Sequence, residues 1–246
     1  MKQENRKLPK NFSREQLAQL AEQMSELIYA NTLIALEAEA ALEAGNDLLI
    51  PLNLRDQPFD GAKCFGTIQN SLALNLTICL ARLFEEPSAK KQHPDYSDVA
   101  SIPLLILTLR KPECRDALCE SARRWTPNLD RMEDVHEATC KKAIDEAIQK
   151  YEEAKKSPEV LNTLETLSHF RNMRVAHSLH GKIVKAIPKY NDLFRLMDIA
   201  RDITTSAILA IDGNSHDLKD AEIEYYREAK AFWEPALTGI KDTLEE

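Results

Sequence analysis

Glycine is scarce in this chain, and the scarcity excludes glycine-rich nucleotide-binding loops. Only 6 of the 246 residues are glycine, whereas dinucleotide fingerprints and P-loops need several glycines close together. The segment most similar to a P-loop spans residues 61–66. Thr67-Ile68 follows it where a P-loop requires Lys and Ser or Thr. Few glycines beside 11 prolines also disfavour an all-β chain, because such a chain depends on many tight turns.

The chain also lacks an excess of positive charge, paired cysteines and a long apolar run. Its 32 basic and 40 acidic residues give a net charge of −8, unlike a general nucleic-acid coat or a membrane-surface protein. Five cysteines without CxxC spacing indicate reduced thiols. Residues 1–10 are polar, and the longest apolar run, 102–107, is too short to cross a bilayer. We therefore expect a cytoplasmic protein with no membrane contact.

Apolar residues recur at helical spacing along most of the chain, and no segment alternates with a period of two. The clearest helix follows Ser13, a predicted N-cap with Gln16 three residues on, and is predicted to end at Gly45. Further helices are predicted at about 67–84, 101–109, 112–125, 128–156, 157–177, 192–211 and 218–246, the last broken at Pro235. The sequence predicts an all-α fold: an antiparallel helical bundle over 12–213, with a C-terminal helical extension over 214–246 packing on it.

The first predicted helix carries apolar residues at alternating steps of three and four, a repeat of 3.5 residues. Such a seam faces either its own bundle or a second subunit, and both arrangements are common. The seam consists of Leu17, Leu20, Met24, Leu27, Asn31, Ile34, Ala38 and Ala41.

One segment departs from the acidic character of the rest of the chain. Residues 166–191 contain no Asp or Glu, although the acidic fraction of the chain predicts about four. The same segment holds five cations and three of the six histidines, so it attracts phosphate locally. These residues are His169, Arg171, Arg174, His177, His180, Lys182, Lys185 and Lys189.

The centre of this segment carries a short motif. Polar Asn172 follows Arg171, and His177 lies six positions after the Arg. This arrangement resembles the Arg-to-His motif of the HEPN superfamily. Upstream, the blocks at 81–84 (Ala-Arg-Leu-Phe) and 101–103 (Ser-Ile-Pro) resemble its abortive-infection, AbiU-like branch, which acts in bacterial phage resistance.

The resemblance, which covers about residues 15–210, implies a fold and an activity. It implies a HEPN-type helical bundle, and active members are metal-independent ribonucleases. They dimerise so that the Arg and His of both subunits line one cleft, whereas other members are inert binding modules or partners of nucleotidyltransferases. The subgroup that such partners modify carries Tyr two residues after the motif His, and Leu179 at that position argues against this modification.

The motif residues suit RNA cleavage in which the 2′-hydroxyl attacks the neighbouring phosphate. This step needs a base, an acid and a cation. His177 is predicted to act as base or acid, since histidine titrates near neutral pH, and Arg171 to hold two phosphate oxygens. On one helix the two residues would lie about 9 Å apart in rise and about 120° apart in direction. A two-fold homodimer, which supplies two of each, therefore suits the chemistry better.

Neighbouring polar residues are expected to contact the substrate. Arg174 and His180 repeat the spacing of the motif, and we prefer the earlier pair because polar Asn172 follows its Arg, whereas apolar Val175 follows Arg174. The expected substrate-binding residues are Asn172, Arg174, Ser178, His180 and Lys182.

Two functions follow from these observations. The first is a metal-independent endoribonuclease of a phage-defence or toxin–antitoxin system: a homodimer that needs no metal or cofactor, with an antitoxin or a nucleotidyltransferase as a further partner class. The second is a non-catalytic HEPN-like module that binds RNA, a nucleotide or a partner protein, which the overall acidic charge favours. His136 and Cys140 have zinc-ligand spacing, but no second ligand pair accompanies them, so no metal site is predicted.

Overall fold

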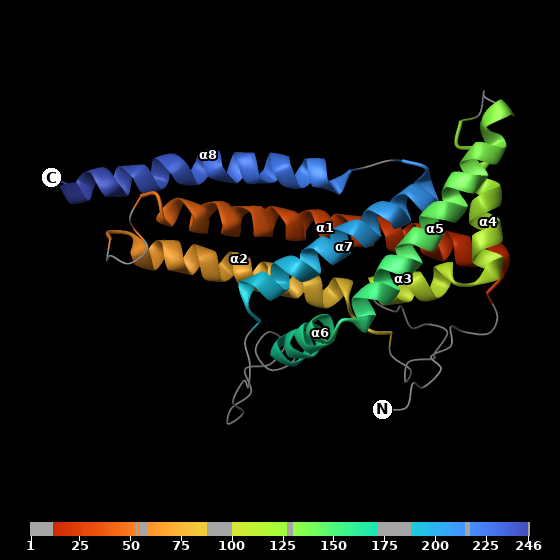
Figure 1. Cartoon of the computed structure of the whole chain (residues 1–246), viewed down its shortest axis with the longest axis horizontal. Coiled ribbons are helices and arrows are strands. Elements are labelled where there is room, and N and C mark those ends of the chain that lie inside the picture. Colours follow the sequence, from red (N-terminus) through yellow and green to blue (C-terminus); the bar gives the residue numbers. More distant parts are fainter. Residues whose placement is uncertain are drawn as a thin grey trace.

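The fold is all-α, as predicted. A computed structural model describes residues 12–52, 54, 59–87, 100–126, 130–171, 188–214 and 217–245. Within these ranges it contains eight α-helices, one short 3₁₀ helix and no strand (Figure 1). The elements are α1 (Arg14–Leu49), α2 (Ala62–Leu83), α3 (Ile102–Leu109), α4 (Pro112–Ala122), η1 (Asp130–Met132), α5 (Glu133–Lys156), α6 (Pro158–Phe170), α7 (Tyr190–Asp212) and α8 (Leu218–Glu245).

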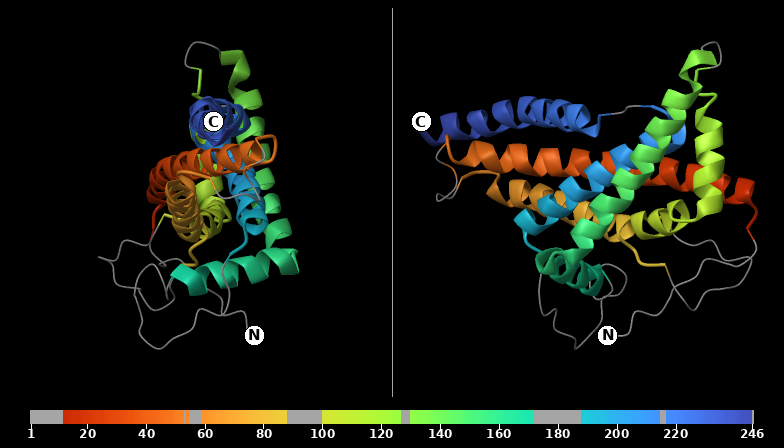
Figure 2. Two further views of the ribbon diagram at one scale, coloured as in Figure 1. Left: turned by 90° about the vertical axis from the view of Figure 1, so that its left-hand side faces the viewer. Right: turned by 45° about the vertical axis from the view of Figure 1, so that its right-hand side comes forward.

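Helix α1 is the long helix against which α2, α3, α4, α7 and α8 pack, whereas α5 and α6 pack on these other helices and on each other. Helices α2 and α7 run antiparallel to it, whereas α8 lies along it in the same direction (Figures 1 and 2). Helices α3, α4 and α5 gather at its N-terminal end, and α6 lies across the bundle below α2 (Figure 1). One large core takes buried side chains from all eight described α-helices, and a smaller cluster lies between α1, α2 and α8.

The start of α1 is confirmed, but its predicted end is wrong. The Ser13 side chain accepts a hydrogen bond from the Gln16 backbone, and the Gln16 side chain accepts one from Ser13 at 2.8 Å. Gly45 does not end the helix, which continues for another four residues. A Cβ at position 45 would lie 2.3 Å from Gln69 Nε2 and 3.2 Å from the Trp233 ring. The missing side chain thus permits close packing rather than a turn.

The apolar seam predicted for α1 is only partly buried. Met24 lies in the core, whereas Leu27 and Ile34 are exposed. The buried stripe is displaced toward α7, where Thr32 Oγ1 lies 3.2 Å from Thr204 Oγ1. Leu17 and Ala38 of the seam are buried while Leu27 and Ile34 between them are exposed, so the 3.5-residue repeat does not mark one buried face of the helix.

Helix α8 docks on α1 through the aromatic residues near its middle. Trp233 is buried and its Nε1 donates a hydrogen bond to the Ala41 carbonyl at 2.9 Å. Leu237 is buried in the same cluster. The predicted break at Pro235 is wrong, because the helix continues through it. Buried side chains on both sides of the proline hold the helix against α1, and tertiary packing outweighs the local helix preference.

Serine caps and a glycine stop fix several other boundaries as predicted. Ser101 and Ser157 each accept a backbone hydrogen bond at the start of a helix with proline in its first turn. Gly213 ends α7 with a φ of +70°, and a Cβ there would come within 2.3 Å of the Trp125 ring.

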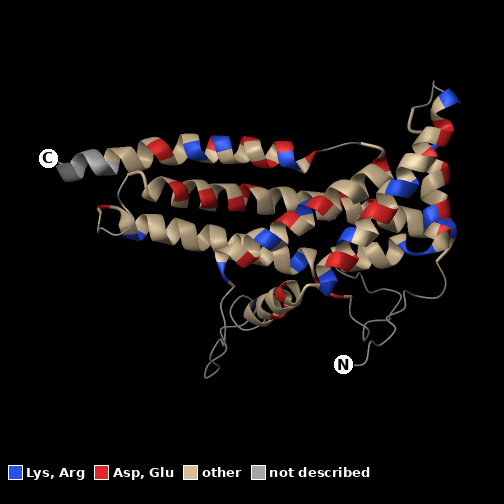
Figure 3. Cartoon of the chain, in the orientation of Figure 1, with Lys and Arg blue, Asp and Glu red and all other residues tan. Residues whose placement is uncertain are grey.

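Helix α2 is unusually free of charge. It carries no charged residue between Lys63 and Arg82 (Figure 3), and by length and composition it could cross a membrane, as core helices of bundles also could. Leu76 and Leu80 are fully buried in the core, whereas Leu74 is exposed on the opposite side. The helix is therefore buried along one face only.

Gln69 of α2 is expected to be replaceable by Met with a gain in stability. Its side chain is buried, and neither amide atom has a hydrogen-bond partner among the described residues. An unsatisfied buried amide costs about 1–3 kcal/mol, and Met has a similar length without polar atoms. We expect Gln69→Met to raise the free energy of unfolding in urea by about 1 kcal/mol. Gln19→Met, at an exposed position of α1, is the control. If Gln69→Met lowers the free energy of unfolding, the buried Gln69 amide is hydrogen-bonded in the folded protein.

Candidate functional site

The predicted motif begins where α6 ends. Arg171 directly follows Phe170, the last residue of α6, and the description resumes at Pro188. Arg171 is thus the one predicted site residue whose surroundings are known. The remaining predicted residues lie outside the described residues: Asn172, Arg174, His177, Ser178, His180 and Lys182.

Helix α6 positions Arg171 through a short apolar face. Ser157 accepts a hydrogen bond from the Val160 backbone at 3.3 Å and starts the helix. Val160, Thr163 and Leu167 are then buried at spacings of three and four residues. This face holds α6 against the bundle and directs its C-terminal end toward α2 (Figure 1).

Arg171 forms an ion pair within its own chain. Its Nη1 lies 2.8 Å from Oε2 of Glu85, and the two side chains are 27% and 31% exposed. Glu85 comes directly after buried Leu83 and Phe84, at the end of α2. The residue that follows the upstream block and the Arg of the motif, far apart in sequence, therefore meet in the fold. The sequence offers no signal for this partner, because adjacent glutamates usually indicate only exposed charge.

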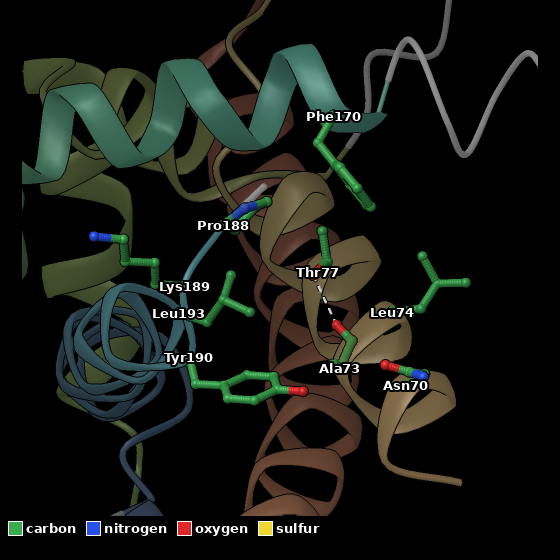
Figure 4. Close-up of a pocket in the computed structure, with 9 residues that line it drawn as sticks. All are labelled: Asn70, Ala73, Leu74, Thr77, Phe170, Pro188, Lys189, Tyr190 and Leu193. Atoms are coloured by element: carbon green, nitrogen blue, oxygen red, sulfur yellow. Dashed lines mark hydrogen bonds between the residues drawn. The ribbon is translucent and has the colours of Figure 1, made fainter. Parts of the chain in front are cut away.

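A cavity lies between α2, the end of α6 and the start of α7 (Figure 4). Its volume is about 390 Å³. Phe170 and Pro188, which flank the part of the motif segment outside the described residues, both belong to its wall. The segment therefore leaves and rejoins the described structure at one cavity. The lining residues are Asn70, Ala73, Leu74, Thr77, Phe170, Pro188, Lys189, Tyr190 and Leu193.

The cavity wall combines aromatic and polar groups. Tyr190 is 40% exposed and extends its ring toward α2 (Figure 4). The Tyr190 and Phe194 rings are stacked, with their centroids 6.5 Å apart and their planes at 17°. On α2, the Thr77 hydroxyl donates to a backbone carbonyl at 2.7 Å, and the Asn70 amide is exposed. Lys189 directs its ammonium group away from the other side chains (Figure 4). Among the described lining residues, Lys189 alone is charged.

Two arginines elsewhere in the described part of the chain are held in ion-pair networks. Arg123 contacts three carboxylates at the start of α5, at 2.7 to 3.4 Å. Arg201 pairs with Asp198 at 2.9 Å, with Asp202 at 3.3 Å and with Glu222. These two arginines are held by structural contacts within the chain.

The cysteines and the helical His–Cys pair have structural surroundings. All five cysteines are free thiols, and burial raises the pKa of Cys114 to about 12. Cys140 donates to the Ala210 carbonyl at 3.1 Å, while His136 packs on the Trp125 ring at 5.8 Å. Within the described ranges, no group of three or more His, Cys, Asp or Glu could hold a metal ion.

Comparison with known proteins identifies the family. The model of the AbiU2 family of HEPN proteins matches residues 51–232, about three-quarters of the chain. The match extends from the end of α1 into α8 and includes Glu85, the cavity and the whole motif segment. Comparison with curated proteins and with solved structures gives no match. On the family match and the all-α fold, the chain belongs to the AbiU2 family of HEPN proteins.

Proposed function

We propose that the protein is a metal-independent endoribonuclease of a bacterial phage-defence or toxin–antitoxin system. The observation that carries the proposal is that the AbiU2 match contains an acid-free basic segment with the Arg-to-His motif, beginning at the cavity. Arg171 binds the scissile phosphate and His177 transfers protons. The active species is a cytoplasmic homodimer, controlled by an antitoxin or a nucleotidyltransferase.

The chemistry needs only side chains that this chain contains. One His177 removes the proton from the 2′-hydroxyl, whose oxygen attacks phosphorus, and the partner's His177 protonates the departing 5′-oxygen. Arg171 stabilises the charge on the phosphoryl oxygens. The products are a 2′,3′-cyclic phosphate and a 5′-hydroxyl. The further phosphate contacts come from the predicted substrate-binding residues Asn172, Arg174, Ser178, His180 and Lys182.

An RNA cleavage assay in EDTA tests the proposal. Wild-type protein is expected to cleave labelled total RNA or tRNA and to leave 2′,3′-cyclic ends. His177→Ala and Arg171→Ala are each expected to lose at least about 100-fold in rate, the usual contribution of a proton-transfer residue and of a group that stabilises transition-state charge, respectively. Arg124→Ala, on an exposed arginine after α4, is the matched control. Full activity in a folded His177→Ala protein would refute the assignment.

The same assay decides the register of the motif. We expect Arg174→Ala and His180→Ala to retain most of the cleavage rate, because both residues are proposed to hold the substrate rather than to transfer protons. If His180→Ala abolishes cleavage while His177→Ala does not, the catalytic pair is Arg174 and His180.

Glu85→Gln is expected to strengthen RNA binding. The carboxylate holds Arg171 at 2.8 Å and competes with phosphate for the guanidinium. An exposed ion pair contributes up to about 1 kcal/mol, so its removal should lower the Kd for RNA by up to about fivefold. Glu86→Gln, which removes a 2.7 Å contact to Lys155 one residue further on, is the control. An unchanged Kd for Glu85→Gln would show that phosphate does not reach Arg171.

The non-catalytic module remains the second candidate function. The ion pair with Glu85 favours it, because an Arg171 neutralised within its own chain is less available to a phosphate. This function predicts RNA binding that weakens with salt, without any cleavage product.

A further inference from the structure

We infer that the cavity between α2, α6 and α7 binds one unpaired nucleobase of a single-stranded RNA. The inference deepens the proposed ribonuclease function and rests on it for the identity of the ligand. The cavity itself, its lining and its position are properties of the described residues.

The size of the cavity fits a base with its ribose. At about 390 Å³, it lies at the lower end of the range of small-molecule sites, which is about 300–1,000 Å³. A phosphate alone would leave most of this volume empty, and Lys189, the one charged residue among the described lining residues, points away from the other lining side chains (Figure 4). The space therefore suits a flat, mostly uncharged group.

Aromatic rings on two sides supply the stacking surfaces. Phe194 stacks on Tyr190 at 17°, which fixes the tyrosine ring while it extends toward α2. Phe170 enters the cavity from the end of α6 (Figure 4). Bases that are free of a duplex stack on such rings, whereas the bases of an A-form helix are paired and out of reach. The aromatic lining thus selects single-stranded RNA.

Polar groups on α2 can contact the edge of the base. Asn70 offers an amide with both donor and acceptor atoms, which matches the mixed edge of a nucleobase. The Thr77 hydroxyl donates its hydrogen bond to the Ala73 carbonyl, so its oxygen can still accept one. Lys189 belongs to the wall and directs its ammonium group outward (Figure 4), where it can meet the phosphate of a neighbouring nucleotide. Among the described residues the arrangement is uncharged inside and cationic outside.

The position of the cavity links it to the proposed chemistry. Phe170 lines the cavity and Arg171 is the next residue. A phosphate held by Arg171 would place an adjacent nucleotide beside the Phe170 ring. The cavity would therefore fix the nucleotide next to the cleaved bond and give the enzyme its preference among unpaired sites.

Binding of an RNA that cannot be cleaved tests the inference separately from catalysis. The probe is a short fluorescent oligonucleotide with 2′-O-methyl groups, which lacks the attacking hydroxyl. We expect Tyr190→Ala to raise its Kd by about tenfold, the usual effect of losing one base–aromatic stack. Tyr190→Phe should restore binding, because it keeps the ring. Phe232→Ala removes a 64% exposed aromatic from α8 and serves as the control.

Salt dependence and photocrosslinking distinguish the roles of the wall residues. Lys189→Ala should reduce the slope of log Kd against log salt by about 0.7, as expected for one phosphate contact on a single strand. Tyr190→Ala should leave that slope unchanged. Irradiation of a probe with 5-iodouridine should attach it to Tyr190 or Phe170.

The outcomes separate this inference from the proposed function. Binding that depends on Tyr190, without cleavage of natural RNA, would support the base site and refute the nuclease. Cleavage that depends on His177, with probe binding unaffected by Tyr190→Ala, would refute the base site alone. A wild-type protein that does not bind the probe, or crosslinks only outside the cavity, would also overturn the inference.

Discussion

Trp233→Ala is expected to lower the free energy of unfolding by about 3–5 kcal/mol, the usual cost of truncating a buried large aromatic residue. The indole ring joins three helices: it lies in α8, donates to the Ala41 carbonyl of α1, and meets the Phe65 ring of α2 at 5.2 Å. Truncation removes the hydrogen bond. It also leaves a cavity beside Gly45 of α1, which has no side chain to fill the space of the indole ring. We therefore expect α8 to separate from α1 before the rest of the bundle unfolds.

Urea unfolding with hydrogen exchange measures both effects. Amides in α8 should lose protection more than those in α5 in the variant. Phe232→Ala is a stringent control, since it changes the adjacent position but removes an exposed ring. If the two variants are equally stable, Trp233 does not hold α8 in place.

Glu39→Gln is expected to stabilise the protein at alkaline pH and to leave it nearly unchanged at pH 4.5. Glu39 is a buried carboxyl of α1. Burial raises its pKa from 4.5 to about 8, helped by the carboxylates of Glu222, Asp198 and Glu43 and opposed by Arg201. These neighbours come from α7, α8 and α1 itself. The protonated, uncharged carboxyl is thus the form that the fold favours.

The sign of the pH dependence follows from this shift. Between pH 4.5 and about 8 the folded protein keeps a proton that the unfolded chain releases. Stability from this group is complete below pH 4.5 and is lost as the pH rises through 8, at up to about 1.4 kcal/mol for each pH unit. Gln is uncharged throughout and should abolish the loss.

Urea midpoints at pH 5, 7 and 9 test this expectation. The difference between Glu39→Gln and wild type should grow with pH. Glu26→Gln, which changes an exposed carboxylate of the same helix, should shift all midpoints equally. Parallel profiles for Glu39→Gln and wild type would mean that Glu39 is ionised in the folded protein at neutral pH.

The starts of three helices were predictable from sequence because a serine cap involves only neighbouring residues, whereas α2 and α5 start at Ala62 and Glu133 rather than at the predicted 67 and 128. Ser13, Ser101 and Ser157 satisfy backbone groups within three positions of themselves. The helix end predicted at Gly45 and the break predicted at Pro235 were wrong because contacts with residues distant in sequence determine the structure at both positions. Gly45 lies where α2 and α8 approach α1, and Pro235 lies within a helix held by buried neighbours. Local preference has little weight where tertiary packing is dense.

A candidate site could be proposed from sequence only where the chain carries a compact signal. The Arg-to-His spacing and the missing acids made Arg171 a candidate within one short segment. Its partner Glu85 and the cavity residues Asn70 and Tyr190 carry no such signal, because each is an ordinary polar or aromatic residue on another helix. Only the packing of α2, α6 and α7 brings these residues together.

The lengthwise pairing of α1 with α8 has a consequence during synthesis. Ala44 and Leu48 of α1 are buried by Trp233 and Leu237, which are translated almost two hundred residues later. At about 5–20 residues per second, this apolar stripe stays uncovered on the nascent chain for roughly ten to forty seconds. During that time it is a surface on which a chaperone or another unfinished chain can bind, so yield in the cell should depend on the speed of translation between the two helices.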